Sequence, residues 1–548
     1  MHRLSLFALA CLALSACDQS GPTFETPPRP SAQRVPFSDL STDGRAMADG
    51  LVSNPSGRVP LGALLTLQTA RPTSVQLEVL GAEPVSHAPD AVRTEHRLPI
   101  LGLYPAAENR VVVRVDAQEQ NQYSLDTLVI ETPPLPPGFP AIDVAPRDAA
   151  RAEPGWTLSH LSIGDDGTFK SYPLLFDHEG QTRWYLDLSD YGDTVFFVRR
   201  LQNGNYLVPF RRALREVDVL GQEVRTWSIP GYVYHHEVIE LPTGNLVVAV
   251  NKDETGTVED HIVEVDRATS AILREWDMRA LLDTDRFDLV ADPVDWFHMN
   301  AIQYDESSDA LIVSGRNQGV VKVTMQNELV WILAPHRGWG VGGDGADTRE
   351  RLLTAVDAAG TPYPQAVQEG ERAAADFDWT WGQHAPLVLS NGNLLVFDNG
   401  FVRHWGTGDA YSRAVEYEID ESAMTVRQVW SYGRSRGEAY FSRIISDVDE
   451  LPETGNLLVA PGVVNFGGES YTYITEVSRA SGAVVSEAKL TFANANNTGQ
   501  GWGQLDISYR AERLPLYPPG YDGIADGETT EEVPGGGAPV VPLQPPSL

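Results

Sequence analysis

The chain has 548 residues, 75 of them acidic and 41 basic, which gives a formal net charge of −34. At roughly 100–200 residues per domain, this length predicts several domains, or one large repeat domain with an appendage. The negative charge excludes nucleic acid as a partner, because phosphate binding requires a basic face. The 48 glycines and 38 prolines favour many turns, and therefore a β-rich architecture over a helical bundle.

The N-terminal segment MHRLSLFALACLALSAC has the pattern of a secretory signal, with a short basic start and an apolar run too short for a permanent membrane helix. Residues 14–17 (LSAC) resemble the cleavage box of bacterial lipoproteins, which implies cleavage before Cys17 and acylation of its thiol. Several acyl chains on one residue hold a protein stably on a membrane. We therefore predict a lipoprotein signal peptide at 1–16, a membrane tether at 17–35 and a periplasmic, membrane-anchored protein. The alternative is a plain signal peptide with an incidental cysteine.

Residues 36–140 contain four short runs of alternating apolar and polar residues: LLTLQTA, SVQLEVLG, RVVVRVDA and DTLVIE. Such runs, separated by Pro, Gly and Asn, predict strands of a small N-terminal β-sandwich domain. A Pro-rich linker, TPPLPPGFP, ends this region. At the other end of the chain, residues 514–548 form an acidic Pro- and Gly-rich tail without a basic residue, most of which we predict to be disordered.

Residues 150–513 repeat themselves in two alternating elements. The first is a turn of the form L-x-x-G-N between two apolar strands, as in LQNGNYLVPF, LPTGNLVVAV, LSNGNLLVFD and LPETGNLLVA, with a degenerate copy in YDESSDALIVSG. The second is an apolar–acidic strand, a turn and a strand that often carries Trp, and it occurs in six copies. Two hairpins for each copy make a four-stranded blade, so the repeats predict an all-β fold with a six-bladed β-propeller. The largest insertion, 336–377, is either a helical lid over the channel or a solvated loop.

Two histidines occupy the same register in two of the repeats. His236 and His384 each lie nine residues before the Asn of an L-x-x-G-N turn, Asn245 and Asn393. Both imidazoles should therefore project at the same depth into the central channel, which the inner strand of each blade lines. The neighbouring His235 should point to the opposite face, because side chains alternate along a strand.

A third histidine, His298, begins the strand before the degenerate turn, and Asn300 follows on the same face. Arg316 lies in the next strand, so its guanidinium would stand beside the imidazoles and recognise an anion. Three histidines could instead bind zinc with water as the fourth ligand. Arg316 argues against that alternative because it would repel a dication, so no metal is predicted.

Four long segments carry a resemblance to a known family: DWFHMNAIQYDESSDALIVSGRNQ, GQHAPLVLSNGNLLVFDNG, YSRAVEYEID and SNPSGRVPLGALLTLQT. They resemble the bacterial arylsulfate sulfotransferases, periplasmic enzymes that do not use the nucleotide sulfate donor PAPS. The resemblance extends from about residue 50 to 510. It implies a small β-sandwich before a six-bladed propeller, small-molecule aryl sulfate and phenol substrates, no metal and no soluble cofactor. A homodimer is expected by analogy alone.

The resemblance also implies a ping-pong transfer of a sulfuryl group from a phenolic sulfate ester to a phenol. Its nucleophile matches His384, which would form a sulfohistidine, and the remaining channel residues match His236, His298, Asn300 and Arg316. A disulfide of some family members has no counterpart, because both cysteines, Cys11 and Cys17, lie in the signal segment.

Two alternatives stay open at this point. A non-catalytic propeller lipoprotein could act as a scaffold of the cell envelope, and an aryl sulfatase could use the same site with water as the acceptor. Exclusion of water from the pocket would distinguish a transferase from a hydrolase, and the sequence does not show it.

Overall fold

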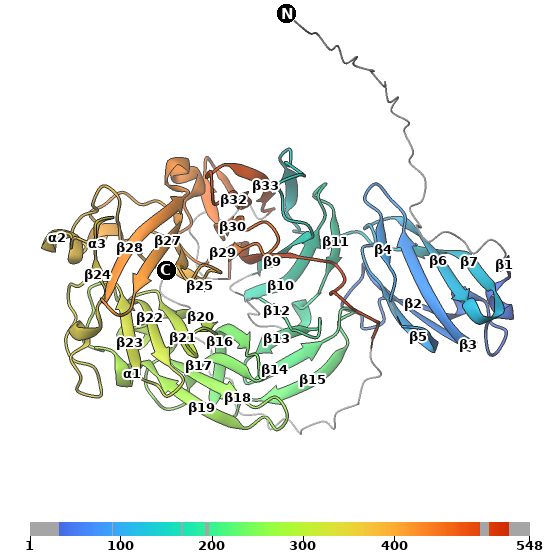
Figure 1. Cartoon of the computed structure of the whole chain (residues 1–548), viewed down its shortest axis with the longest axis horizontal. Helices are drawn as coiled ribbons and strands as arrows, with labels where there is room; N and C mark the ends of the chain where they lie inside the picture. The colour runs from blue at the N-terminus through green and yellow to red at the C-terminus, as the bar shows by residue number, and fades with distance from the viewer. Residues whose placement is uncertain (1–31, 90, 166–167, 192–196, 494–502, 525–548) are drawn as a thin grey trace, which may run out of the picture.

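The computed structural model describes residues 32–89, 91–165, 168–191, 197–493 and 503–524 (Figure 1). The predicted signal peptide and Cys17 lie outside the described residues. Among the helices that are described, none is both long and apolar enough to cross a membrane.

The N-terminal domain is built around one long strand, β3 (Ala63–Val79), which belongs to two halves of the domain. Its first half pairs with β2 (Leu51–Ser53) and β5, and its second half pairs with β4 and β6. LLTLQTA and SVQLEVLG, expected to be two strands, are thus one. Pro72 lies in the irregular stretch between Gln68 and Thr73, where the ladder with β5 shifts register just before β3 pairs with β6. The other strands are β1 (Gln33–Arg34), β4 (Val85–His87), β5 (Arg93–Ile100), β6 (Glu108–Ala117) and β7 (Gln122–Glu131).

The second domain is a ring of six sheets, each of which is one blade. The inner strands of neighbouring blades contact one another around the centre of the ring (Figure 1). The predicted architecture, a six-bladed β-propeller after a small β-sandwich, is therefore confirmed. From the inner to the outer strand, the first blade is β34 (Ile507–Leu514), β9 (Trp156–Asp165), β10 (Thr168–Phe176) and β11 (Thr182–Tyr185). The second blade is β12 (Arg199–Arg200), β13 (Tyr206–Phe210), β14 (Ala213–Val217) and β15 (Glu223–Ser228). The third blade is β16 (Tyr232–Glu240), β17 (Leu246–Lys252), β18 (His261–Val265) and β19 (Ile272–Asp277).

The remaining three blades follow in chain order, and two of them carry an extra outer strand. The fourth blade is β20 (Met299–Asp305), β21 (Ala310–Gly315), β22 (Gly319–Thr324) and β23 (Leu329–Leu333). The fifth blade is β25 (His384–Val388), β26 (Leu394–Asp398), β27 (Arg413–Asp420), β28 (Thr425–Tyr432) and β24 (Thr354–Ala355). The sixth blade is β29 (Asp447–Glu450), β30 (Leu457–Ala460), β32 (Glu469–Val477), β33 (Val484–Thr491) and β8 (Ala141–Val144). A short strand, β31 (Val464–Phe466), pairs with β32.

Both ends of the propeller sequence close the ring. The C-terminal strand β34 pairs with β9 as the inner strand of the first blade, and β8 pairs with β33 as the outer strand of the sixth. The L-x-x-G-N element forms the inner hairpins of the other blades, which explains why it occurs one time fewer than the second element. Because β8 belongs to the sixth blade, the propeller begins before the predicted boundary at 150.

Tryptophans of the second element link each of the first four blades to the next one. The indole N–H of Trp184 donates to the carbonyl of Val219, 2.9 Å away, in the outer turn of the following blade. Three further indole N–H groups donate to the following blade: Trp227 to the carbonyl of Arg267, Trp276 to the carbonyl of Thr324, and Trp331 to the carboxylate of Glu421. Each bond satisfies the polar group of a buried indole.

The Asn of the L-x-x-G-N turn holds the two hairpins of a blade together. The side-chain amide of Asn245 donates to the buried carboxylate of Glu264 on the third strand, at 2.8 Å. The same pair recurs in three other blades, as Asn205–Glu216, Asn393–Glu416 and Asn456–Glu476. In the fourth blade the buried residue of the third strand is Lys322, and it pairs with Asp305 at 3.0 Å. The fourth blade therefore has the opposite charge at this position.

Residues 336–377 lie along the outer edges of the fourth and fifth blades. Strand β24 runs parallel to β28, and Leu353, Val367 and Phe377 are buried against it (Figure 1). The segment includes the short helix α2 (Gln365–Gln368). The insertion is therefore neither a lid over the channel nor a solvated loop, because it packs against the outer strands of the propeller.

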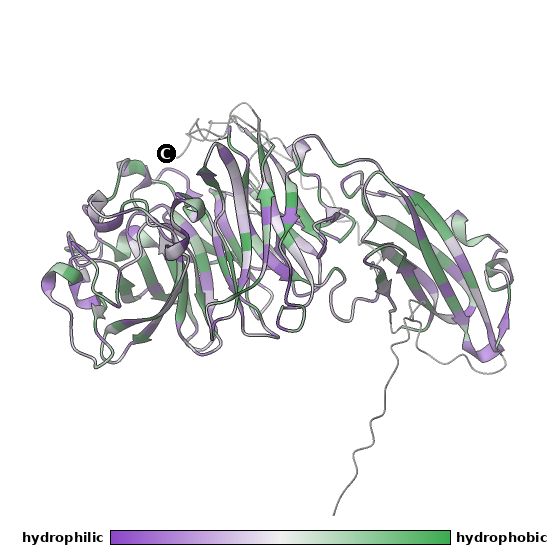
Figure 2. Cartoon of the chain, turned by 90° about the horizontal axis from the view of Figure 1, so that it is seen from above, coloured by the Kyte–Doolittle hydropathy of each residue, from purple (hydrophilic) through white to green (hydrophobic). Residues whose placement is uncertain are grey.

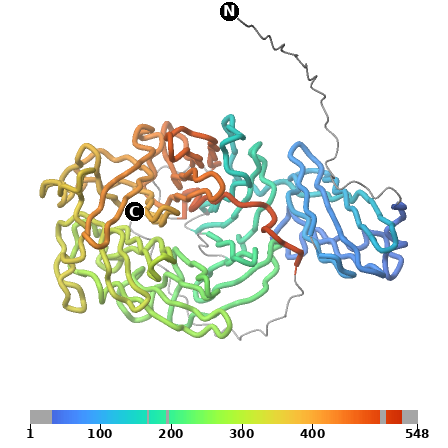
Figure 3. The backbone as a smooth tube through the Cα atoms, viewed as in Figure 1, coloured from blue at the N-terminus to red at the C-terminus, as the bar shows by residue number. Residues whose placement is uncertain are grey.

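The beginning of the predicted disordered tail is ordered, which corrects the expected boundary at 514. Leu516 is buried, Tyr517 stacks on His87 at 4.0 Å, and its hydroxyl accepts a hydrogen bond from the backbone N–H of Leu101. Figure 3 shows this segment running from the propeller to the sandwich domain. Aromatic and aliphatic residues among the prolines thus dock the tail up to Ile524, and residues 525–548 lie outside the described part.

The sandwich and the propeller pack directly against each other. The fully buried guanidinium of Arg183 donates to the carbonyl of Gly102 in the sandwich, at 2.6 and 2.9 Å, and to Asp177 on its own side. Hydrophobic residues recur along the strands of both domains (Figure 2), and one hydrophobic core includes residues of both.

We predict that Asn245→Ala destabilises the protein, because the buried carboxylate of Glu264 loses its amide donor. An unsatisfied buried acceptor costs about 1–3 kcal/mol. Urea unfolding followed by tryptophan fluorescence measures the shift of the midpoint. Ser228→Ala, on an exposed position of an outer strand, is the control and should cost less than about 0.5 kcal/mol. Equal midpoints for the two variants would contradict this role of Asn245.

Candidate active site

Irregular pairing of the inner strands shapes the centre of the ring. The ladder between β16 and β17 shifts between Tyr234 and Val238, and the ladder between β25 and β26 shifts between His384 and Leu387. Bulges also interrupt the inner strands β20 and β34. A bulge bends the strand and re-aims its side chains, and bulges are common beside active sites. The predicted site residues lie at or next to these bulges.

The structure brings together the five residues predicted for the channel. His236 and His298 have ring centroids 5.4 Å apart, and the backbone N–H of Arg316 donates to the carbonyl of His298 at 2.9 Å. Asn300 donates to the carbonyl of Gln383, the residue before His384, at 2.8 Å. The charges of Arg316, His298 and His236 all act on His384. All five side chains are buried, with exposed fractions of 8 % or less.

His384 has a fixed orientation and a defined tautomer. Its Nδ1 lies 2.8 Å from Oδ1 of Asn399. The amide nitrogen of Asn399 donates to the carbonyls of Ser442 and Ile445, both at 2.9 Å, so its oxygen must face the imidazole. Nδ1 of His384 therefore carries the proton and Nε2 carries the lone pair. Burial and the charge of Arg316 lower the pKa of His384 well below its ordinary value, so the ring is neutral at neutral pH.

His298 has the opposite electrostatic environment. Its Nδ1 lies 2.6 Å from a carboxylate oxygen of Asp295 and 3.2 Å from one of Glu259. Burial acts to lower the pKa of His298, but the carboxylates of Glu259 and Asp295 outweigh it and raise the pKa above its ordinary value. The imidazolium form of His298 is therefore stabilised by these two carboxylates.

His236 connects the site to the strand that closes the ring. Its Nδ1 lies 2.8 Å from the hydroxyl of Tyr509 on β34, and its Nε2 lies 3.5 Å from Glu259. Three residues of the site have a positive φ: His236 at 49°, His298 at 53° and Glu259 at 58°. Non-glycine residues in this conformation are strained, and such strain concentrates at functional sites.

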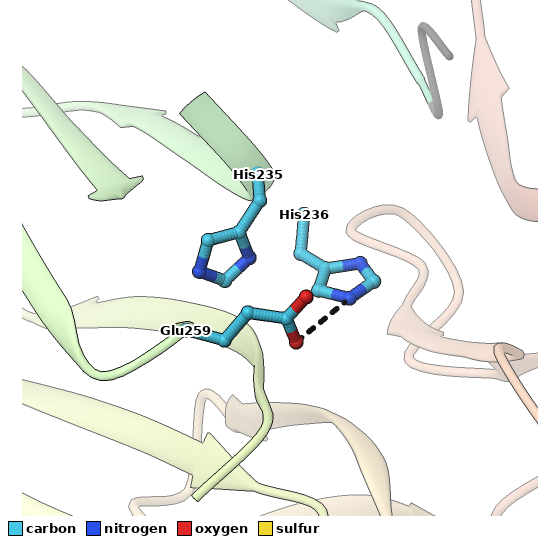
Figure 4. Close-up of side chains that lie close together, drawn as sticks. All are labelled: His235, His236 and Glu259. Carbon is cyan, nitrogen blue, oxygen red and sulfur yellow. Dashed lines mark ion pairs between the residues drawn. The ribbon is translucent and has the colours of Figure 1, made fainter. Parts of the chain in front are cut away.

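His235 does not point to the opposite face, in contrast to the expectation from strand alternation. Figure 4 shows His235 and His236 together beside Glu259, and one ligand atom of each residue lies within 4.8 Å of the others. The bulge between Tyr234 and Val238 breaks the alternation that the sequence argument assumed. Burial lowers the pKa of His235 to about 3, so this ring is neutral.

Arg316 and Asn300 present polar atoms without partners. Nε of Arg316 and Oδ1 of Asn300 are buried and make no hydrogen bond within the described residues. The guanidinium of Arg316 lies 4.8 Å from the ring centre of Phe401, and Arg443 approaches the same ring at 5.5 Å. Burial, reinforced by Arg443, lowers the pKa of Arg316 to about 10, which leaves it charged at neutral pH. Two cations and a buried amide thus form a set suited to an oxygen-rich anion.

Two groups of side chains have a spacing compatible with a metal ion. One is His235, His236 and Glu259, and the other is Glu259, Asp295 and His298. Both depend on Glu259, whose negative charge already faces the imidazoles and whose pKa they lower despite the opposing effect of burial. In both groups the carboxylate of Glu259 pairs with imidazoles, with His236 at 3.5 Å and with His298 at 3.2 Å.

Sequence reasoning missed four residues of the site: Glu259, Asp295, Asn399 and Tyr509. Asp295 precedes His298 by three residues, and Asn399 directly follows β26, the strand that pairs with the strand of His384. Proximity to a predicted site residue was therefore an available signal. Glu259 lies in a connection and Tyr509 lies in the closing strand, where neither belongs to a repeated motif.

We predict that Glu259→Gln lowers the pKa of His298, because one of the two carboxylates that stabilise its imidazolium is lost. An opposite charge this close shifts a pKa by about one unit or more. NMR titration of labelled histidine, with the signal assigned through His298→Gln, measures the change. The exposed Glu371→Gln should leave the titration unaltered. An unchanged His298 titration in Glu259→Gln would refute the pairing.

Comparison with known proteins agrees with this architecture. The family model "Arylsulfotransferase (ASST)" matches residues 119–501, and the model "Arylsulfotransferase Ig-like domain" matches residues 51–133. The chain is similar to arylsulfate sulfotransferase AssT of Escherichia coli O6:H1, with 27 % identity over 526 residues, which cover 77 % of this chain and 85 % of the relative. AssT of Lelliottia amnigena is 27 % identical over 517 residues, which cover 76 % of this chain and 85 % of that protein. The chain therefore belongs to the arylsulfotransferase family and is an enzyme of sulfuryl transfer, as its motifs predicted.

Proposed function

We propose that this enzyme moves a sulfuryl group from an aryl sulfate to a phenol through a covalent intermediate on Nε2 of His384. The observation that carries the proposal is the hydrogen bond between Nδ1 of His384 and Asn399, which leaves the lone pair on Nε2. No hydrogen bond to this Nε2 is made by any described residue. A neutral imidazole nitrogen is a competent nucleophile, and the depressed pKa keeps this ring neutral.

In the first half of the reaction, Nε2 of His384 attacks the sulfur of the aryl sulfate. The N–S bond forms, the bond between sulfur and the phenolic oxygen breaks, and its electron pair stays on that oxygen. His298 is the acid that protonates this oxygen, because Asp295 and Glu259 stabilise its imidazolium form and occupy Nδ1, which leaves the N–H at Nε2 for transfer.

In the second half, a phenol attacks the sulfur of the sulfohistidine. The new S–O bond forms, the electron pair of the N–S bond returns to Nε2 of His384, and neutral His298 accepts the proton of the phenol. Both halves use the same groups in opposite directions, which is the logic of a ping-pong mechanism.

Arg316 and Asn300 are placed to recognise the sulfuryl oxygens. Arg316 contributes N–H donors and a charge, and Asn300 retains one N–H beyond its bond to Gln383. Arg443 adds a second cation beside Arg316. At the site itself, these two charges attract an anionic donor, against the long-range repulsion of a chain whose net charge is −34.

We predict that the wild-type enzyme, mixed with p-nitrophenyl sulfate and no acceptor, gains the mass of one SO3 group on the peptide that carries His384. The sample stays at neutral to alkaline pH, because N–S bonds of this type are acid-labile. His384→Ala should lose the adduct and at least about 10³-fold of donor cleavage, since the covalent route is removed. His336→Ala, in the peripheral segment, is the control.

Added phenol should remove the adduct and yield the aryl sulfate of that phenol. Inorganic sulfate as the main product would instead identify a hydrolase. A wild-type enzyme that releases nitrophenol with no adduct on any peptide, or near-normal turnover in His384→Ala, would refute the covalent mechanism.

We also propose that the enzyme is a periplasmic lipoprotein, anchored through acylated Cys17. The support is the LSAC sequence at residues 14–17, followed by a Pro-rich tether that would hold the folded domains away from the membrane. Wild-type protein should sediment with membranes, and Cys17→Ser should appear in the soluble periplasmic fraction. Equal partition of the two would refute the anchor.

A further inference from the structure

We infer that Asn399 is a positioning residue whose neutral amide keeps the sulfohistidine on His384 reactive enough to pass its sulfuryl group on. This inference rests on the proposed covalent mechanism and extends it to a residue outside the predicted channel set. The key observation is a contrast between two imidazoles that share one site. Nδ1 of His298 faces two carboxylates, at 2.6 and 3.2 Å, whereas Nδ1 of His384 faces an amide at 2.8 Å.

The orientation of this amide is set by the neighbouring blade. Asn399 is fully buried just after β26, and its Nδ2 donates to two backbone carbonyls in the segment that leads to β29. Rotation by 180° would break both bonds and place two donors against Nδ1 of His384. The oxygen of Asn399 is therefore a permanent acceptor, which keeps the proton of His384 on Nδ1.

The chemical consequence lies in the intermediate. After transfer, Nε2 carries the SO3 group and Nδ1 keeps its proton, so the ring is an imidazolium. It leaves as neutral imidazole when a phenol attacks, and neutral imidazole is a good leaving group. An amide oxygen supports this cation only modestly, so the N–S bond stays easy to break.

A carboxylate at the same place would have the opposite effect. It would either stabilise the imidazolium by charge or take the Nδ1 proton, and the second case would force the ring to leave as an imidazolate. Both outcomes make the sulfohistidine a poorer sulfuryl donor. A carboxylate beside the ring would also make Nε2 more basic, so the attack on the aryl sulfate would not suffer in the same way.

The test is to follow the two half-reactions separately in Asn399→Asp. Rapid mixing with p-nitrophenyl sulfate measures the first half as a burst of nitrophenol, and loss of the adduct after addition of phenol measures the second. We expect the burst rate to be retained or increased, and the second half to slow by at least about tenfold, the change that one pKa unit represents. The adduct should then accumulate during steady-state turnover.

Asn327→Asp is the matched control, because it makes the same substitution in an outer turn of the fourth blade, where Asn327 has a positive φ that Asp also tolerates. It should leave both half-reactions unchanged. Equal slowing of the two half-reactions in Asn399→Asp would mean a merely structural role and would overturn the inference. Absence of any adduct in the wild type would instead refute the covalent mechanism itself.

A second measurement does not depend on the folding of the Asn399→Asp variant. In the wild-type enzyme with ¹⁵N-labelled histidine, the signal assigned through His384→Gln should show a protonated Nδ1 and an unprotonated Nε2. The reverse tautomer would overturn the inference, because Asn399 would then not hold the proton on Nδ1 of His384.

Discussion

Closure of the ring by the last strand is the constraint on which both the fold and the site depend. Strand β34 completes the first blade by pairing with β9, and the same strand brings Tyr509 to His236 and Arg510 to Glu237. An open ring would have an unpaired edge at β9 and would leave His236 without its hydroxyl partner. The pairing of β34 with β9, which joins opposite ends of the propeller sequence, therefore both stabilises the ring and positions a residue of the site.

Repetition made most of the fold predictable. The six copies of the second element are the six outer hairpins, and the L-x-x-G-N copies are inner hairpins, because each pattern encodes a physical need. The turn glycine, such as Gly244 with a φ of 84°, adopts a conformation that suits glycine, and the Asn satisfies a buried Glu. The register of these turns was also sufficient to select His236 and His384 from the twelve histidines of the chain.

The residues that could not be predicted lie where the repetition ends. Alternation placed His235 on the wrong side, because a bulge leaves no signature in a single sequence. Glu259 and Tyr509 lie in a connection and in the closing strand, so no repeated neighbour revealed them. The tail beyond 514 and the rim segment 336–377 are ordered by docking against other parts of the chain, which composition does not report. The sequence thus predicts local hairpins and shared register, whereas long-range docking requires the structure.

The reversed charge in the fourth blade has a consequence for assembly. Because the blades are similar, an inner hairpin can pair with the outer hairpin of the wrong blade during folding. Such a pairing would trap a misassembled ring. Lys322 requires Asp305 in the inner hairpin, whereas Glu264 requires an Asn. An exchange between these blades would bury the carboxylate of Glu264 against that of Asp305, and buried charges without partners are strongly unfavourable. The Lys322–Asp305 pair thus favours correct pairing of the two hairpins of the fourth blade over pairing with hairpins of other blades.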